Sequence, residues 1–300
     1  MAERPLPGQI AARAGVDYLV RPLRERDELR RLLLPNRSYA AYALGQLQPE
    51  LFARSAWWMA RGSQGQALLL HSRGGLGNAL FALGDVDALQ ALLQLHPGPR
   101  QTFLTCQVRH LDTVLRYYDL PERQSMLRML VDRDTFQPVE GVARRLAGRD
   151  VRQVNRLYRS EGAAALYTAE NIEQAAYFAV YAGRQPVAIA GTHVIAPDDG
   201  IAVVGNVYTH PAHRDRGLGS IVTSAVTAHL LATSREVVLS VDPRNFAAAR
   251  AYRRLGYREV GRLIESPAVR REPALSTFLR RRVATLRGRR YGAELVSISR

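Results

Sequence analysis

The sequence contains no lysine, so its 42 basic side chains are all arginine. With 27 acidic residues the formal net charge is +15, an excess that often indicates a phosphate-rich partner. A chain selected only to bind phosphate has little reason to avoid lysine, because lysine also neutralises phosphate. We attribute part of the arginine excess to compositional bias and do not expect nucleic acid to be the partner.

Cysteine is nearly absent as well. The single Cys106 excludes an intrachain disulfide and any metal site built from several thiolates, and we expect no metal. Cys106 lies in the apolar run FLTC, which favours a small core residue over a nucleophile.

Long hydrophobic runs are also missing. No segment approaches the roughly 18 consecutive apolar residues of a membrane span, and MAERPLPGQI does not resemble a secretory signal. These absences predict a cytoplasmic protein without a membrane partner. The composition is 47% hydrophobic and 23% charged, as in globular proteins, and 300 residues favour two domains.

The second half of the chain has a clear pattern of elements. Apolar runs at 185–196 and 201–209, separated by the turn PDDG, predict an antiparallel hairpin. The rest of the pattern predicts a helix at 218–233, a strand at 236–241, a helix at 245–255 ended by Gly256, and a strand at 257–266. This order predicts an α/β architecture (α+β) with a mixed sheet.

The first half contains a fainter copy of this pattern. Residues 100–120 align with 235–255 without a gap, and 125–133 occupy the place of the following strand. The similarity is low, so duplication and a chance likeness of two strand-helix-strand units both remain open. The run at 80–97 leads into its helix without arginine or paired glycines, so only the second half has a glycine loop.

That loop is Arg214-Asp215-Arg216-Gly217-Leu218-Gly219-Ser220. Here a strand ends and a helix begins within a few residues, so several backbone N–H groups and the positive end of the helix dipole point into one small volume. Such a geometry binds phosphate, and glycines let a ligand approach the backbone. By itself the pattern fits a plain turn equally well.

The context of the loop resembles the GNAT acyltransferase superfamily. The sequence Thr209-His-Pro211 precedes Arg214-x-x-Gly217-x-Gly219, as in the superfamily's pyrophosphate-binding loop. A second signature follows at the expected separation, and its members are Asn245, Ala248, Tyr252, Gly256 and Tyr257. The resemblance covers roughly 150–267 and implies two tandem acyl-CoA N-acyltransferase-like domains, of which only the second is complete.

The resemblance also implies roles for individual residues. Main-chain groups of Val207 and Thr209 would contact the pantetheine arm and the thioester carbonyl of acetyl-CoA, and the backbone of about 215–220 would hold its pyrophosphate. Asn245 would contact pantetheine or simply cap its helix. Tyr252 would protonate the departing CoA thiolate or simply pack against the sheet.

The base that deprotonates the amine acceptor is less clear, because AVVGNVYT contains no acid. His193 is the first candidate, since histidine titrates in the useful range, although a structural histidine is the alternative. Asn206 is a second polar interruption of the hairpin. Glu161 and Glu170 lie in the segment that corresponds to the superfamily's substrate-binding helices and are candidates for the acceptor site or for solvated surface.

We therefore expect direct acyl transfer to a small-molecule or peptide amine, in a protein that can form a homodimer. The expected units are a degenerate domain at 1–140, a catalytic domain at 141–283 and an arginine-rich tail at 284–300. A last strand is expected near 276–281, followed by a solvated tail or a basic arm. A non-catalytic acyl-CoA-binding module and a basic nucleic-acid-associated protein are the alternatives.

Overall fold

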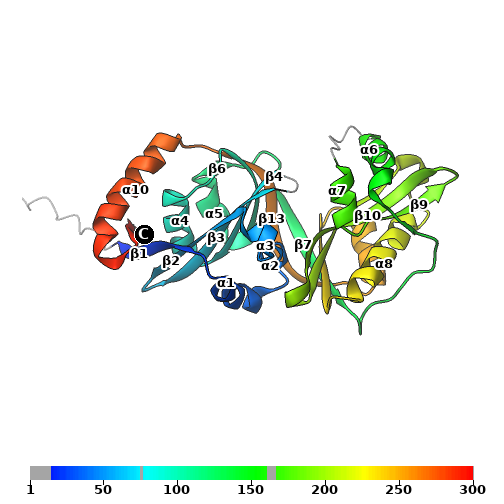
Figure 1. The fold of residues 1–300 in the computed structure, drawn as a ribbon, viewed down its shortest axis with the longest axis horizontal. Helices are drawn as coiled ribbons and strands as arrows, with labels where there is room; N and C mark the ends of the chain where they lie inside the picture. Colours follow the sequence, from blue (N-terminus) through cyan, green and yellow to red (C-terminus); the bar gives the residue numbers. More distant parts are fainter. Residues whose placement is uncertain (1–14, 75–76, 161–166, 300) are drawn as a thin grey trace, which may run out of the picture.

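The protein is an elongated molecule with two halves joined through one sheet, as seen in a computed structural model (Figure 1). The structure describes residues 15–74, 77–160 and 167–299. The C-terminal segment returns to the half that contains the first strand, at the end of the molecule opposite helix α8 (Figure 1).

The elements follow one another in a repeated order of strands and helices. The first half contains β1 (Val16–Leu23), α1 (Arg26–Leu33), α2 (Ala41–Gly45), α3 (Pro49–Phe52), β2 (Ser55–Gly62), β3 (Gly65–Gly74), β4 (Gly77–Gly84), α4 (Val86–Leu95), β5 (Gln101–Gln107), α5 (Leu111–Leu115), β6 (Tyr118–Asp119) and β7 (Gln124–Asp132). The second half contains β8 (Arg144–Arg145), α6 (Val151–Arg159), α7 (Ala169–Gln174), β9 (Phe178–Ala182), β10 (Gln185–Ala196), β11 (Ile201–Thr209), α8 (Leu218–Leu231), β12 (Glu236–Val241), α9 (Phe246–Arg254) and β13 (Arg258–Arg270). Two last elements follow, α10 (Ala274–Gly288) and β14 (Glu294–Ile298).

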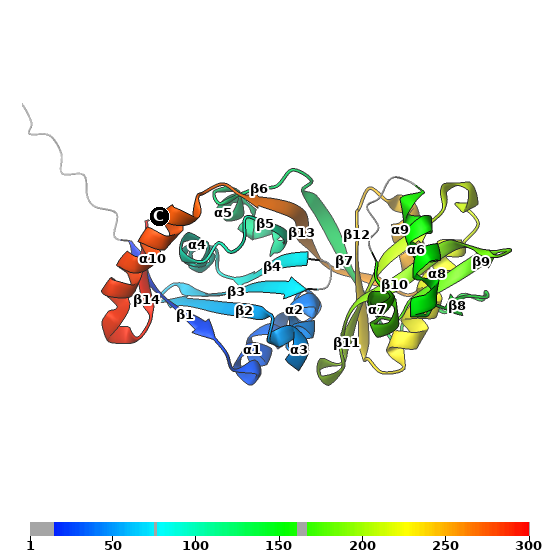
Figure 2. The same ribbon diagram turned by 45° about the horizontal axis from the view of Figure 1, so that its top comes forward.

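One mixed sheet runs through both halves in the order β14-β1-β2-β3-β4-β5-β13-β7-β12-β11-β10-β9-β8, with β6 paired to β13. The neighbours β4 and β5 are parallel, and so are β11 and β12. The centre of the sheet is the antiparallel pair β13 and β7, which Figure 2 shows between the two halves.

The two halves exchange one strand each. β13, from the second half of the chain, pairs with β5 of the first half, and β7, from the first half, pairs with β12 of the second. The order strand, helix, strand at 101–132 thus repeats at 236–270, as the faint sequence copy predicts. The mixed α/β fold in two tandem units is confirmed, and the exchange makes the sheet continuous.

Helices cover both faces of the sheet. In the first half, α4 packs on one face through fully buried Leu89 and Leu92, whereas α1 and α2 pack on the other through Leu29 and Leu44. Truncating a leucine such as Leu92 to alanine should cost about 2–5 kcal/mol. The buried cluster under α1 and α2 also includes Val203 and Val238 of the second half, so it fixes the two halves together. Within the described residues no helix is both long and apolar enough to cross a membrane.

The expected elements of the second half are present. The hairpin is β10 and β11, joined by a turn in which Gly200 has φ +62°, and the predicted helices and strands are α8, β12, α9 and β13. Gly256 follows α9 with φ +91°, and a Cβ there would lie 1.8 Å from the Thr135 carbonyl oxygen. Glycine is required at this helix end because φ is positive and because any side chain would clash with that carbonyl oxygen. Cys106 is fully buried, and burial raises the pKa of its thiol to about 12, as expected of a core residue.

The C-terminal segment differs from the prediction. Residues 276–281 lie inside helix α10 rather than in a strand, because a run rich in Arg, Leu and Ala favours helix and buries Thr277, Ala284 and Gly288. The segment 284–300 is not a solvated tail, since β14 pairs antiparallel with β1. Its alternating Glu294, Val296 and Ile298 are buried and cover what would otherwise be a sheet edge. The division of the chain near residue 140 remains a proposal.

Candidate active site

The parallel strands β11 and β12 separate along their length. They are paired only at Ile201–Val203 with Glu236–Val238, and the ladder ends there. Asn206, with φ +54°, makes a bulge that shifts the β10–β11 register between the pairs Ile189–Tyr208 and Gly191–Gly205. The Tyr158 hydroxyl donates to the Asn206 carbonyl at this bulge. Beyond the ladder the two strands therefore leave a wedge-shaped gap, which we call the wedge. The backbone of residues 204–209 forms its edge on β11.

The glycine loop lies at the end of this wedge. A short turn at Pro211–His213 follows β11, and Arg214 Nε donates to the Thr209 carbonyl, 3.2 Å away. Asp215 and Gly217 both have positive φ, +62° and +74°, and α8 starts at Leu218 without a side-chain cap. The first-turn amides of α8 therefore point outward from a loop that is exposed to solvent.

The individual loop residues have different constraints. A Cβ at Gly217 would meet no atom within 4 Å, so glycine is required there by its conformation and not by crowding. A Cβ at Gly219 would lie 3.5 Å from Thr209 Oγ1, an ordinary contact. Arg214 holds the end of β11, whereas the exposed Arg216 makes no hydrogen bond or ion pair with the part of the chain that the structure describes. Ser220 lies in the first turn of α8.

Asn245 and Tyr252 lie at the start and within α9. Asn245 Oδ1 accepts a hydrogen bond from the Ala248 amide at 3.1 Å, so the residue is a helix cap, and its side-chain N–H groups point elsewhere. Tyr252 is buried, and its ring centroid lies 6.0 Å from that of Tyr257. Burial raises the pKa of Tyr252 to about 12, which keeps its hydroxyl protonated at neutral pH.

His193 lies on the opposite side of the sheet from α8, above the small residue Gly205. A Cβ at Gly205 would come 2.3 Å from the His193 ring, so the imidazole occupies the space that a side chain on β11 would otherwise fill. Its Nδ1 lies 3.0 Å from the Tyr42 hydroxyl of α2, and its ring is accessible to solvent. Surrounding protein atoms lower the pKa of His193, and Arg128 lowers it further.

Tyrosine side chains gather next to this histidine. Asn206 Nδ2 donates to the Tyr177 hydroxyl at 2.8 Å, and Tyr158 stacks on Tyr167 with centroids 5.1 Å apart. Tyr158 also packs against Tyr208 of β11. These rings form a polar aromatic wall beside the bulge, which the sequence analysis indicated only through Asn206.

Sequence reasoning missed two charged residues near the wedge. Arg128 of β7 is the largest fully buried side chain, and none of its three guanidinium nitrogens has a hydrogen-bond partner among the described residues. It lies opposite Ser240 of β12 in the ladder. Ser240 Oγ donates to Glu265 Oε1 at 3.3 Å, and burial raises the pKa of Glu265 while Arg128 opposes that rise. In the sequence, the only sign of the pair Arg128 and Glu265 was a lone arginine in the apolar run SMLRMLV.

Of the two glutamates predicted for the acceptor site, Glu170 lies in the part of the chain that the structure describes. Glu161 lies outside the described residues. Glu170 is exposed in the first turn of α7 and accepts a hydrogen bond from Gln174 Nε2 at 2.9 Å, as a solvated surface residue would. Within the described residues no group of three or more histidine, cysteine, aspartate or glutamate side chains is arranged to hold a metal ion.

The corresponding junction in the first half has no room for a loop. β4 ends at Gly84 and α4 begins at Val86, with only Asp85 between them. Asp85 Oδ2 accepts a hydrogen bond from the Gln66 amide at 2.9 Å. The start of α4 therefore already has a carboxylate at the position where a phosphate-binding loop would need free backbone N–H groups. Of these two junctions, the one between β11 and α8 has the geometry of a phosphate site and the one between β4 and α4 does not.

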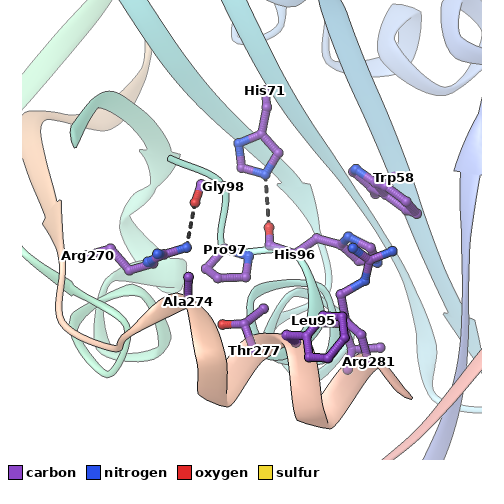
Figure 3. A pocket seen from close by; sticks show the side chains of 11 residues that line it. Trp58, His71, Leu95, His96, Pro97, Gly98, Arg270, Ala274, Thr277 and Arg281 are labelled. Atoms are coloured by element: carbon purple, nitrogen blue, oxygen red, sulfur yellow. Dashed lines mark hydrogen bonds between the residues drawn. The ribbon is translucent and has the colours of Figure 1, made fainter. Parts of the chain in front are cut away.

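A separate cavity of about 290 Å³ lies between the first half and the start of α10 (Figure 3). Its wall includes Trp58, His71, Arg270 and Arg281. His71 Nε2 donates to the His96 carbonyl at 2.9 Å, and burial lowers the pKa of His71 to about 4, so this histidine is neutral. None of the residues predicted for catalysis lines this cavity, and we assign the candidate site to the wedge, beside which His193 lies.

Comparison with known proteins identifies the fold. The profile of the FR47-like protein family matches residues 180–264, from β9 into β13. A tandem GNAT protein from the clavulanic acid biosynthesis pathway is 15% identical, with a TM-score of 0.50 over 86% of this chain and 99% of that chain. The chain has the tandem GNAT fold.

Two further GNAT structures resemble the chain over most of their length. A GCN5-related N-acetyltransferase from Sphaerobacter thermophilus is 18% identical, with a TM-score of 0.53 over 86% of this chain and 98% of that chain. One from Kribbella flavida is 19% identical, with a TM-score of 0.53 over 71% of this chain and 89% of that chain. No curated protein matches the chain. At these identities the likeness establishes the GNAT fold, and the chemistry has to be argued from the site.

Proposed function

We propose that this protein is an acyl-CoA-dependent N-acyltransferase that transfers an acetyl group directly from acetyl-CoA to an amine. The observation that supports it is the junction of the β11–β12 wedge with the uncapped start of α8. A pyrophosphate fits the exposed amides at 217–220, and an extended pantetheine arm fits the unpaired edge of β11. No covalent enzyme intermediate is required, because the amine attacks the thioester itself.

The residues around the wedge can supply the two proton transfers. In the proposed reaction the amine nitrogen bonds to the thioester carbon, the carbon–sulfur bond breaks, and the sulfur leaves as a thiolate. His193 takes the proton from the amine through Nε2, because its Nδ1 is engaged by Tyr42. Tyr252 returns a proton to the thiolate, for which its raised pKa keeps it in the acid form. Strand amides of β11 stabilise the charge that develops on the carbonyl oxygen.

Glu265 is the alternative base. It lies beside Ser240, two residues beyond the end of the β11–β12 ladder, and its raised pKa makes it a stronger base than an exposed glutamate. His193 is preferred because it lies directly over β11, next to the bulge at which the thioester would be held.

The decisive experiment measures acetyl-CoA binding by calorimetry and thiol release with pooled amines. Gly217→Trp should abolish both, since a side chain there projects into the phosphate site. Gly183→Trp is a matched control, because Gly183 also has positive φ (+59°), with nothing within 4 Å of a Cβ, but lies in the β9–β10 turn. Equal binding by wild type and Gly217→Trp would refute the proposed site. Binding without turnover for any amine would indicate a non-catalytic acyl-CoA-binding module.

A further inference from the structure

Helix α10 carries a stripe of large apolar side chains on its outer surface. Five of them are more than half exposed: Leu275 67%, Phe278 53%, Leu279 56%, Val283 55% and Leu286 71%. Their spacing of three and four residues places them along one side of the helix. We call these five residues the α10 stripe. Exposed apolar residues that gather on one side of a helix, rather than lying scattered singly, mark a site of contact.

The opposite side of the helix attaches it to the protein. Thr277, Ala284 and Gly288 are buried, and a Cβ at Gly288 would lie 2.1 Å from the Ala293 carbonyl oxygen. At about 100° per residue these three positions lie across the helix from the α10 stripe. Small residues let α10 pack closely on its own half, and the large residues face away from it.

The surroundings of the stripe are strongly basic. Six arginines lie between 280 and 290, and no acidic residue occurs from 274 to 292. Arg280 and Arg281 are paired with Glu272 and Glu294. Four arginines form no ion pair with any described residue: Arg282, Arg287, Arg289 and Arg290. The stripe and these charges therefore favour an anionic partner.

A second copy of the chain fits this surface poorly. Pairing two α10 helices along their stripes would bring two sets of these arginines together without an acid on either helix, and the repulsion would oppose the apolar contact. Helix α10 lies at one end of the long molecule (Figures 1 and 2). Such a helix can meet a flat surface without interference from the rest of the protein.

Arginine and aromatic side chains are also arranged as at a lipid interface. The guanidinium of Arg282 lies 5.3 Å from the Phe278 ring centroid, and that of Arg290 lies 4.7 Å from Tyr291. Arginine beside an aromatic ring can remain at the level of the headgroups while the apolar residues lie deeper.

We propose that α10 is an interfacial helix through which the protein binds reversibly to membranes that contain anionic lipid. The α10 stripe enters the boundary between headgroups and acyl chains, to a depth of roughly 5–10 Å, and the unpaired arginines contact the lipid phosphates. The expectation of no membrane partner was drawn from the lack of a spanning segment, which a helix lying in the interface does not need. The inference is independent of the acyl-transfer site.

The test is co-sedimentation of the full chain with vesicles of phosphatidylcholine alone or mixed equally with phosphatidylglycerol. Wild type should bind the mixed vesicles at least about tenfold more strongly than the neutral ones. Leu279→Glu should lower that binding by roughly tenfold or more, because it places a charge in the apolar boundary. Val142→Glu is the matched control, since Val142 is 89% exposed and lies in the segment before β8; its binding should equal that of wild type.

Several outcomes would overturn the proposal. Absence of binding to the mixed vesicles contradicts it directly. Binding that survives in Leu279→Glu reflects the net charge of +15 alone. A wild-type dimer in light scattering that becomes a monomer in Leu279→Glu, with no vesicle binding, would assign the stripe to contact between two copies. Thermal unfolding of both glutamate variants checks that the exposed substitutions leave the fold intact.

Discussion

The hydroxyl of Tyr42 lies 3.0 Å from Nδ1 of His193, although 151 residues separate them in the chain. Tyr42 belongs to α2 of the first half and His193 to β10 of the second. If His193 acts as a base through Nε2, Nδ1 carries the proton and donates it to Tyr42. The first half of the chain would then orient a residue in the candidate site of the second.

Tyr42→Phe should therefore slow transfer without weakening acetyl-CoA binding. Loss of the acceptor at Nδ1 lets the imidazole adopt the wrong tautomer, and we expect kcat to fall by roughly tenfold. Steady-state kinetics with acetyl-CoA varied should show an unchanged KM. Tyr39→Phe is a suitable control, because Tyr39 loses a hydroxyl that donates to Ala82 at 2.6 Å and does not contact His193. Equal activity of Tyr42→Phe and wild type would contradict the orienting role.

A plot of kcat/KM for acyl transfer against pH should show one decline on the acid side, which we call the acid limb. Desolvation by the surrounding protein and the charge of Arg128 lower the pKa of His193 below its ordinary 6.5, so the neutral base predominates above pH 6.5 and is lost as the pH falls through the lowered value. His193→Gln should lower kcat/KM by roughly 10²–10³ and remove the limb. If Glu265→Gln removes the limb and His193→Gln leaves it, Glu265 is the base.

Arg128→Met should move that limb to higher pH. The Arg128 charge lowers the pKa of both His193 and Glu265, so its removal raises both values. Because Met removes the positive charge that opposes the raised pKa of buried Glu265, the variant should be destabilised by about 3–5 kcal/mol. Urea unfolding and the pH profile of kcat/KM measure the two effects. An unmoved acid limb would show that Arg128 does not influence the base.

Tyr252→Phe should lower kcat by roughly 10²-fold while acetyl-CoA still binds. The phenol has a pKa of about 12, so wild-type activity should show no basic limb from Tyr252 below pH 10. Stability should change by less than about 1 kcal/mol, since the ring stays in place and no hydrogen bond is lost. Acyl donors with a more acidic thiol should reduce the difference in kcat between variant and wild type, because their thiolate leaves without needing a proton. A difference that is the same for all donors would point to packing alone.

Glu294→Ala should destabilise the protein by about 2–4 kcal/mol. Glu294 of β14 contacts His96 at the end of α4 and accepts from Arg281 of α10 at 3.0 Å. Burial raises the pKa of Glu294, but His96 and Arg281 outweigh this effect and hold it below 4.5, and burial lowers that of His96 below 6.5.

Both depressed pKa values act in the same direction. The stability they contribute is present at neutral pH and is lost as the pH falls from about 6.5 through the folded values. Thermal unfolding between pH 7 and 4 should show a steeper decline in Glu294→Ala than in wild type, because Glu294 raises the pKa of His96 and its removal lowers that pKa further. Equal stability of the two proteins at pH 7 would mean that the contacts of Glu294 with His96 and Arg281 do not stabilise the fold.

Local patterns in the sequence determined much of the second half. Alternating apolar runs, the turn at Gly200 and the spacing from Arg214 to Gly219 each depend on a few neighbouring residues, and the hairpin, the loop and α8 lie where they were expected. The same holds for the cap at Asn245 and the helix end at Gly256, because capping and positive φ are properties of the local backbone.

Only the tertiary structure decided which distant residues meet. The exchange of β7 and β13 brings Arg128 next to Ser240, and the packing of α2 on β10 brings Tyr42 to His193. Both depend on pairing between segments more than a hundred residues apart, for which no local pattern carries a signal. β14 was missed for the same reason, since it becomes a strand by pairing with β1 at the other end of the chain.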